Sequence, residues 1–296
     1  MTLLGTLERR TPPIVGLAVA IVAVSTSAIL IRFSDVPSGP MAFWRVTLTW
    51  LLLAPLALRS REEFRRFDRR DLVSALLAGL ALAAHFATWF ESVDKTTVAA
   101  SVTLVTTQPA FVAVGAYLLF GESLSRRSLA GIGIALAGSV VMSLDGLLGV
   151  TTASEPTLGN LLALAGAVLA GLYVLAGRSV RQRISLVPYV TVVYVVCAAG
   201  LLAYSLAAGD AVVGYPPREW LLFLGMAVGP GLLGHTVVNW ALAHIESSVV
   251  SVAFVGEPVG STLLALLLLG EVPGWLTLVG GAVVIGGIYL TARGRD

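Results

Sequence analysis

The sequence predicts an all-α membrane protein with ten transmembrane helices, and three observations support this fold class. Of the 296 residues, 57% are hydrophobic and only 12% are charged, whereas a soluble domain has roughly 25% charged residues. Apolar segments of about twenty residues, the length that spans a bilayer, recur along the whole chain. The connections between them are short, so we expect no extramembrane domain between the helices.

The ten expected spans follow one another from residue 12 to residue 292. They cover residues 12–32, 37–58, 71–93, 97–119, 127–144, 158–177, 186–208, 219–242, 248–269 and 273–292. The first span follows Arg9 and Arg10, as the apolar part of a signal peptide would. Because it has spanning length and no small-residue cleavage site follows it, we expect it to be retained as a helix.

The distribution of basic residues predicts the orientation. If the N-terminus is cytoplasmic, fifteen of the 19 basic residues lie on the inner side and only Arg32, Lys95 and Arg218 lie outside, with Arg45 within a span. Cytoplasmic loops carry such an excess of Lys and Arg. We therefore expect both termini in the cytoplasm, as an even number of spans requires. The basic loop at residues 59–70 is expected to set topology and to contact anionic lipid rather than nucleic acid.

The chain repeats itself at an offset of 149 residues. At this offset Pro109 meets Pro258, because 258 − 109 = 149, and several glycines and leucines after these prolines also meet identical residues. The sequence therefore predicts two copies of one unit, residues 12–144 and 158–292. Since each copy has five spans, the two should insert with opposite orientations, an arrangement that is common in secondary transporters.

Polar residues lie inside the fourth and ninth spans, beside these two prolines. Gln108 precedes Pro109 and Glu257 precedes Pro258. Each proline removes one backbone hydrogen bond and is expected to kink its helix. Lipid tolerates no unpaired carbonyl group, so the kinks should face protein or a watery cavity. Gln108 and Glu257 are predicted either to line that cavity or to tie neighbouring helices together.

The doubled pattern resembles the drug/metabolite transporter superfamily, and within it the EamA-type exporters with ten helices. The resemblance rests on TTVAASVTLVTTQPAFVAVGAYLLFGES and SSVVSVAFVGEPVGSTLLALLLLGEV, and on the Phe43–Arg45 stretch in the second span. It covers essentially the whole chain, which looks most like bacterial amino acid exporters, including the aromatic amino acid type. It implies an exporter of the bacterial inner membrane that works by alternating access. One departure is Gln108, where the family often has Glu.

Further candidate substrate-binding residues lie on the third and eighth spans and on the sixth. His85 and His235 are nearly equivalent in the two copies and could bind a substrate carboxylate, carry a proton or join two helices. With Glu257 they are the candidates for proton coupling. Aromatic or polar side chains near them complete the predicted set: Trp89, Tyr173, Asn239 and Trp240.

Three charged residues are assigned structural roles by their positions. Arg45 lies within the second span, where we expect it to pair with Glu91, although contact with a substrate carboxylate is an alternative. Glu122 and Glu271 each follow a glycine at the end of a span. Turn or capping chemistry is the expectation for both.

Several other functions are disfavoured by the sequence. It contains no metal-ligand spacing, no nucleotide-binding loop and no paired nucleophile and base, so we expect no cofactor, no metal and no enzyme activity. An intramembrane enzyme is the least favoured alternative from another class. A channel would need a polar filter segment, and none is apparent. A nucleotide-sugar carrier of the same fold remains an alternative, but it needs basic residues within the spans. The expected partners are the lipid bilayer and a small, amino-acid-like substrate; the oligomeric state is open, and a monomer is compatible with the sequence.

Overall fold

The computed structural model describes residues 13–121, 125–148, 153–181, 183–237 and 256–293, and every regular element in these ranges is helical. The first half contains α2 (Pro13–Ser25), α3 (Ser27–Phe33), α4 (Ser38–Arg59), the short 3-10 helix η1 (Arg61–Arg66), α5 (Arg69–Lys95), α6 (Val98–Val105), α7 (Gln108–Phe120) and α8 (Arg126–Leu147). The second half contains α9 (Pro156–Arg181), α10 (Leu186–Ala208), α11 (Pro217–Met226), the π-helix η2 (Ala227–Thr236), α14 (Gly256–Leu269) and α15 (Trp275–Arg293).

The prediction of an all-α membrane protein is confirmed at this level. Seven described helical segments, counting α2 with α3 and α6 with α7, are long and apolar enough to cross a bilayer, and α14 and α15 are shorter apolar helices. Large apolar side chains point outward, among them Leu118, Leu221 and Leu267, which are 70%, 70% and 76% exposed. A soluble monomer rarely carries so much exposed apolar surface, so these side chains face lipid. The full count of ten stays a prediction, because spans 219–242 and 248–269 extend beyond the described residues.

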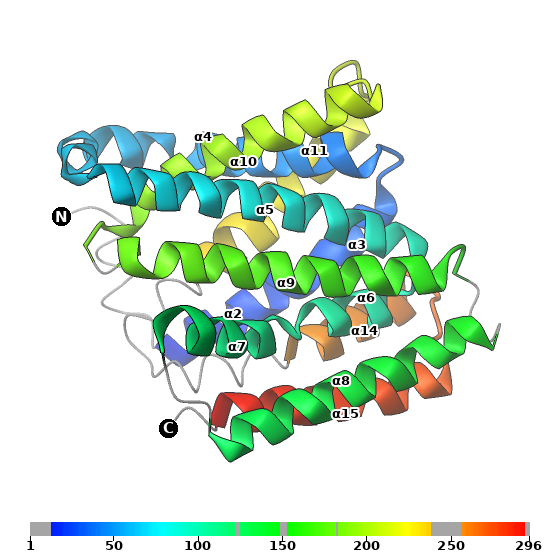
Figure 1. Ribbon diagram of the computed structural model, residues 1–296. Helices are drawn as coiled ribbons and strands as arrows, with labels where there is room; N and C mark the ends of the chain where they lie inside the picture. The colour runs from blue at the N-terminus through cyan, green and yellow to red at the C-terminus, as the bar shows by residue number, and fades with distance from the viewer. Residues whose placement is uncertain (1–12, 122–124, 149–152, 182, 238–255, 294–296) are drawn as a thin grey trace.

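Two pairs of helices that are 149 residues apart in the sequence lie side by side. Helix α4 packs against α10, and α8 packs against α15, which form one edge of the bundle in Figure 1. Helix α14 (Gly256–Leu269) is the counterpart of α7, since 108 + 149 = 257, and it contacts α6, the helix before α7. Ends of helices match at the same offset: α4 ends at Arg59 and α10 ends at Ala208, since 59 + 149 = 208.

The helices of the α8–α15 pair run in opposite directions and touch through their backbones. A Cβ on Gly131 would lie 2.6 Å from the carbonyl oxygen of Gly287, and one on Gly138 would lie 2.7 Å from that of Gly280. From one contact to the next, the residue number rises along α8 and falls along α15, so the two helices are antiparallel. Only glycine allows this approach, because small residues let two membrane helices come into close contact.

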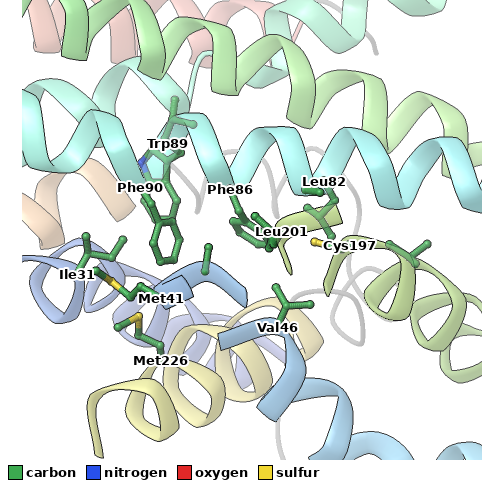
Figure 2. Close-up of a cluster of buried hydrophobic side chains, with 14 of the residues drawn as sticks. Ile31, Met41, Val46, Leu82, Phe86, Trp89, Phe90, Cys197, Leu201 and Met226 are labelled. Carbon is green, nitrogen blue, oxygen red and sulfur yellow. The ribbon is translucent and has the colours of Figure 1, made fainter. Parts of the chain in front are cut away.

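The helix pair α4 and α10 is also antiparallel and borders the larger apolar core. Gly39, near the start of α4, approaches Ser205, near the end of α10. At the other end of the pair, Glu63, just after α4, accepts a hydrogen bond from Ser185, which precedes α10. Buried side chains from α3, α4, α5, α10 and α11 form this core, and Figure 2 shows part of it.

Ionic contacts tie the start of α5 to the loop before α10, in the second half of the chain. Arg183 contacts Asp68 at 3.1 Å and also Asp71, which is 1% exposed. Asp68 and Asp71 form a reciprocal capping box at the start of α5. The backbone N–H of Asp71 and the Arg183 guanidinium, in that order, hold the pKa of Asp68 below its ordinary value.

A similar link joins the start of α11 to the loop before α4. The buried carboxylate of Glu219 accepts a hydrogen bond from the Ser34 hydroxyl at 2.5 Å. Arg218 pairs with Asp35 at 2.7 Å. Each half of the chain therefore anchors a helix start of its own on a loop of the other half.

Candidate functional site

Three of the expected spans are interrupted within their apolar part. The first is interrupted at Thr26, between α2 and α3, and the fourth at Thr106 and Thr107, between α6 and α7. The eighth changes from the α-helix α11 to the π-helix η2 at Ala227. Such interruptions free backbone groups inside the membrane, and transporters build substrate sites from them. Only the interruption beside Pro109 was anticipated; the Ser-Thr-Ser run at 25–27 and the Gly-Pro-Gly run at 229–231 were overlooked signals.

Hydroxyl groups add hydrogen bonds to carbonyls of the turn before two of these interruptions, and some of these carbonyls also accept from a backbone N–H. Thr106 donates to the carbonyl of Val102 at 2.9 Å, and Thr107 donates to that of Leu104 at 2.6 Å. In the first span, Ser25 donates to the carbonyl of Ile21 at 2.8 Å. Ser and Thr side chains that bond back to the preceding turn compete with the helical ladder and bend helices. The ring of Pro109 adds to this effect in the fourth span.

Helix α14, which carries Glu257, packs onto the interruption of the first span. Ser261 donates to the carbonyl of Ser25 at 3.1 Å, and the Ser25 hydroxyl also lies 3.4 Å from the carbonyl of Glu257. A Cβ on Gly260 would lie 2.5 Å from the Ser25 hydroxyl, so the absence of a side chain permits the contact. Pro258 is the third residue of α14, and the chain before Gly256 lies outside the described residues.

Arg45 occupies the space between α3, α4 and α5. It is 2% exposed, and its guanidinium donates to the Ser27 hydroxyl, just after the interruption, at 3.3 Å. Its Cζ atom lies 4.6 Å from the ring centre of Phe86 and 5.6 Å from that of Phe90. Figure 2 shows these rings on α5 with Trp89. A desolvated guanidinium gains attraction from aromatic faces, which partly offsets the cost of burial.

The expected pairing of Arg45 with Glu91 is wrong. Glu91 lies one turn from Lys95 on the same helix, and the Lys95 ammonium contacts it at 3.4 Å. Lys95 also contacts Glu155 at 2.6 Å. Arg45 instead points to Ser27 and the aromatic rings. Lys95, one turn away at the end of the same helix, pairs with Glu91, so Arg45 has no ion pair with that carboxylate.

His85 joins α5 to α9 and stacks on Trp89. Its Nδ1 atom lies 2.8 Å from the carbonyl oxygen of Gly166. A carbonyl only accepts, so Nδ1 carries the proton, and in the neutral ring the Nε2 atom holds a free lone pair. The rings of His85 and Trp89 are 10° from parallel with centres 6.0 Å apart. The interhelical bond considered for His85 therefore exists, and its other nitrogen is left for a further contact.

Two of the predicted site residues lie close to the surroundings of Arg45. His85 stacks on Trp89, whose ring centre lies 5.9 Å from the Arg45 Cζ atom, and the backbone carbonyl of Glu257 lies 3.4 Å from the hydroxyl of Ser25, two residues before Ser27. They lie on α5 and α14, and His235 lies on η2, so the three are far apart in the sequence. His235 is exposed, whereas Glu257 is half-buried. Helices α5 and α14 thus bring two residues of the predicted site to the region of Arg45, to which sequence analysis gave a structural role.

The other predicted residues lie further from Arg45 or beyond the described structure. Tyr173 on α9 is half-buried and packs against the larger apolar core, as does Tyr194 on α10. Gln108 is the first residue of α7 and is half-buried, and the contacts described here do not link it to Arg45. Asn239 and Trp240 lie outside the described residues.

Glu271 caps a helix other than its own. Its carboxylate accepts from the backbone N–H of Val98, the first residue of α6, at 2.6 Å, and pairs with Arg32 at 3.1 Å. Glu271 therefore has the expected capping role, but it caps the start of α6 rather than its own helix, and its contacts link three spans. The equivalent Glu122 lies outside the described residues. Within the described ranges, no three His, Cys, Asp or Glu side chains are grouped to hold a metal ion.

Known proteins resemble this chain over most of its length. A transporter of Archaeoglobus fulgidus with no assigned substrate is 24% identical over 286 residues, 96% of this chain and 98% of its own. The pseudopaline exporter CntI of Pseudomonas aeruginosa is 25% identical over 85% of each chain. A probable terminal-alkyne amino-acid exporter of Streptantibioticus cattleyicolor is 26% identical over 64% of this chain and 62% of its own.

The same fold and a family pattern are found by two further comparisons. A protein of known crystal structure superposes with a TM-score of 0.63 over 94% of this chain and 96% of its own, at 22% identity, which shows a shared fold. The model of the EamA-like transporter family matches twice, over residues 12–144 and 157–293. With its apolar helices and interrupted spans, this multi-pass membrane chain belongs to the EamA-like transporter family.

Proposed function

We propose that this chain is a secondary transporter that exports small metabolites, among them amino acids including aromatic ones, across the bacterial inner membrane. The observation that carries the proposal is the buried Arg45, which donates to Ser27 just after the interruption of the first span. His85 stacks on Trp89, whose ring also lies near Arg45, and α14 brings Glu257 to the same interruption. Charged groups at this depth are costly, by at least about 2.5 kcal/mol each on insertion scales, and generally mark a pathway. Two relatives that are named as exporters support the direction of transport.

The proposed mechanism is alternating access between two inverted repeats, residues 12–144 and 158–292, in a bundle of ten helices with both termini cytoplasmic. Two observations support it: the helices of the pairs α4–α10 and α8–α15 are antiparallel, and their ends match at one sequence offset. A half-turn about an axis in the membrane plane relates such repeats, and their rocking opens a central site to each side in turn.

The proposed substrate contacts are the predicted set, centred on the aromatic and charged residues of α5, η2 and α14. They are His85, Trp89, Gln108, Tyr173, His235, Asn239, Trp240 and Glu257, with Pro109 and Pro258 shaping the helices. Stacked aromatic rings suit an apolar or aromatic side chain, and the mixture of charges suits a cargo of no net charge. Glu257, His85 and His235 are the candidates for proton coupling.

The test is counterflow of radiolabelled phenylalanine, tryptophan, threonine and methionine in liposomes, with and without a pH gradient. We expect saturable counterflow at matched pH for at least one of them. If a proton gradient drives export through Glu257, then Glu257→Gln should retain counterflow and lose gradient-driven transport. Glu155→Gln removes a carboxylate that contacts Lys95 at the membrane surface, and it should behave as wild type in both assays. The absence of counterflow for all four would contradict the proposed cargo.

A further inference from the structure

Arg45 has more hydrogen-bonding capacity than the protein around it uses. A guanidinium carries five N–H donors in a fixed planar fork. The hydrogen bond described for it runs to the Ser27 hydroxyl at 3.3 Å, and no described carboxylate lies within 4.0 Å of it. Its other neighbours are the faces of Phe86, Trp89 and Phe90. A buried arginine is stable when paired and fully hydrogen-bonded, so this one has room for an anionic ligand.

Trp89 supplies a second donor at the same place. Its indole Nε1 is buried and has no hydrogen-bond partner among the described residues, and the side chain is 5% exposed. The Arg45 Cζ atom lies 5.9 Å from the centre of the Trp89 ring. An orphaned N–H group inside a protein costs free energy unless a ligand pairs with it. Two unsatisfied donors, one charged and one neutral, therefore lie beside each other.

We propose that Arg45 and Trp89 form the subsite for the carboxylate of the transported substrate, with the Ser27 hydroxyl beside them. This assignment rests on the proposed function and specifies the chemistry of the same site. The fork of Arg45 matches the two oxygens of a carboxylate, and bidentate pairs of this kind are short and strong. The Trp89 N–H donates to the same group from the edge of the aromatic cluster.

The charge of the surroundings selects a zwitterion over a dianion. The backbone carbonyl of Glu257 lies 3.4 Å from the Ser25 hydroxyl, two residues before Ser27, so Glu257 is the carboxylate assigned to a substrate ammonium group. In the neutral ring, the Nε2 lone pair of His85 is a second acceptor. A phosphate dianion would need a second cation, but the other eighteen Lys and Arg residues lie at or beyond the ends of the expected spans (19 − 1 = 18). The subsite therefore suits the α-carboxylate of an amino acid.

The experiment measures binding of four probes to the purified full-length chain by isothermal titration calorimetry. The probes are L-phenylalanine, L-phenylalaninamide, 3-phenylpropionate and phenethylamine, which differ in whether they keep the carboxylate and the ammonium group. We expect the wild type to bind phenylalanine at least tenfold more tightly than its amide, and 3-phenylpropionate more tightly than phenethylamine, because hydrogen bonds to charged groups contribute strongly.

Matched tryptophan variants locate the effect. Trp89→Phe keeps a ring and removes only the unpaired N–H, so it should reduce the preference for carboxylate probes by about tenfold. Trp50→Phe removes another buried indole N–H without a partner, on α4, and should leave the preference unchanged. Arg45→Lys keeps the charge and loses the fork, and should weaken phenylalanine more than phenethylamine. Exposure of the buried thiol of Cys197 on heating reports whether each variant is folded.

The outcomes separate this assignment from the proposed function. Equal binding of phenylalanine and its amide, or equal preferences in Trp89→Phe and Trp50→Phe, would overturn the carboxylate subsite even where counterflow of amino acids is observed. The protein could bind 3-phenylpropionate in a way that depends on Trp89 and yet show no counterflow of amino acids. That result would support the subsite and contradict the proposed cargo. If neither phenylalanine nor 3-phenylpropionate binds, the carboxylate subsite is overturned.

Discussion

The backbone contact between α8 and α15 allows a sharp test with two neighbouring glycines. A Cβ added at Gly287 would lie 2.4 Å from the backbone nitrogen of Ala135 and 2.6 Å from the carbonyl oxygen of Gly131. A Cβ added at Gly286 would meet nothing within 4 Å. Gly287→Ala and Gly286→Ala therefore make the same chemical change one residue apart on one helix, with opposite consequences for packing.

The expected magnitude follows from these distances. Ordinary contact begins at 3.4 Å, so α15 must move away from α8 by about 1.0 Å to accept alanine at Gly287 (3.4 − 2.4 = 1.0). The atoms in the way belong to the backbone, so no side-chain rotation relieves the overlap. Overpacking of this kind costs about 1–3 kcal/mol. Replacement of a helical glycine by alanine favours the helix by roughly 0.5–1 kcal/mol at either position, so that gain cancels in the comparison.

The assay uses the single cysteine of the chain. Cys197 is buried in α10 and becomes accessible to a thiol-reactive fluorophore when the bundle unfolds. We expect the apparent Tm of Gly287→Ala to lie roughly 2–12 °C below that of Gly286→Ala, on the scale of about 2–4 °C per kcal/mol. Gly286→Ala should melt at or slightly above the wild-type temperature. Equal Tm values for the two variants would show that α8 and α15 do not touch through these glycines, and the packing described here would be refuted.

Three further predictions concern polar contacts. Asp68→Asn keeps a capping side chain but loses the charge beside Arg183. Because the pKa of Asp68 is lowered, we expect the variant to have a slightly lower Tm than wild type at pH 7, and the two Tm values to converge as the pH falls below about 4. A difference in Tm that persists in acid would contradict the ionic explanation. Glu271→Gln should lose only the ion pair with Arg32, which is worth up to about 1 kcal/mol of unfolding free energy. Glu271→Leu also leaves the backbone N–H of Val98 unpaired, and chemical unfolding should show a further loss of about 1–3 kcal/mol. Equal losses of unfolding free energy in the two variants would exclude the cap. His85→Asn places an amide nitrogen near Nδ1 and should retain more thermal stability than His85→Leu, unless the bond to α9 contributes nothing.

Composition and pattern were sufficient to predict the class of the protein. The scarcity of charge and the recurrence of spanning apolar segments follow from the bilayer as solvent, which acts on every residue independently of its neighbours. The repeat that relates Pro109 to Pro258 could also be found without a structure, because it is a comparison of the sequence with itself. The EamA pattern rests on the same local residues and is matched by the family.

The tertiary structure decided which of the polar residues meet. The sequence places Arg45 and Glu91 on successive spans and suggests an ion pair, yet Lys95 lies one turn from Glu91 and takes it, while Arg45 contacts Ser27 and three aromatic rings. The interruption at Thr26 depends on hydroxyls that bond to the preceding turn and on a glycine of α14 that lets another helix approach. Which partner a buried charge finds is set by the packing of several helices at once, and no local pattern along one helix encodes that choice.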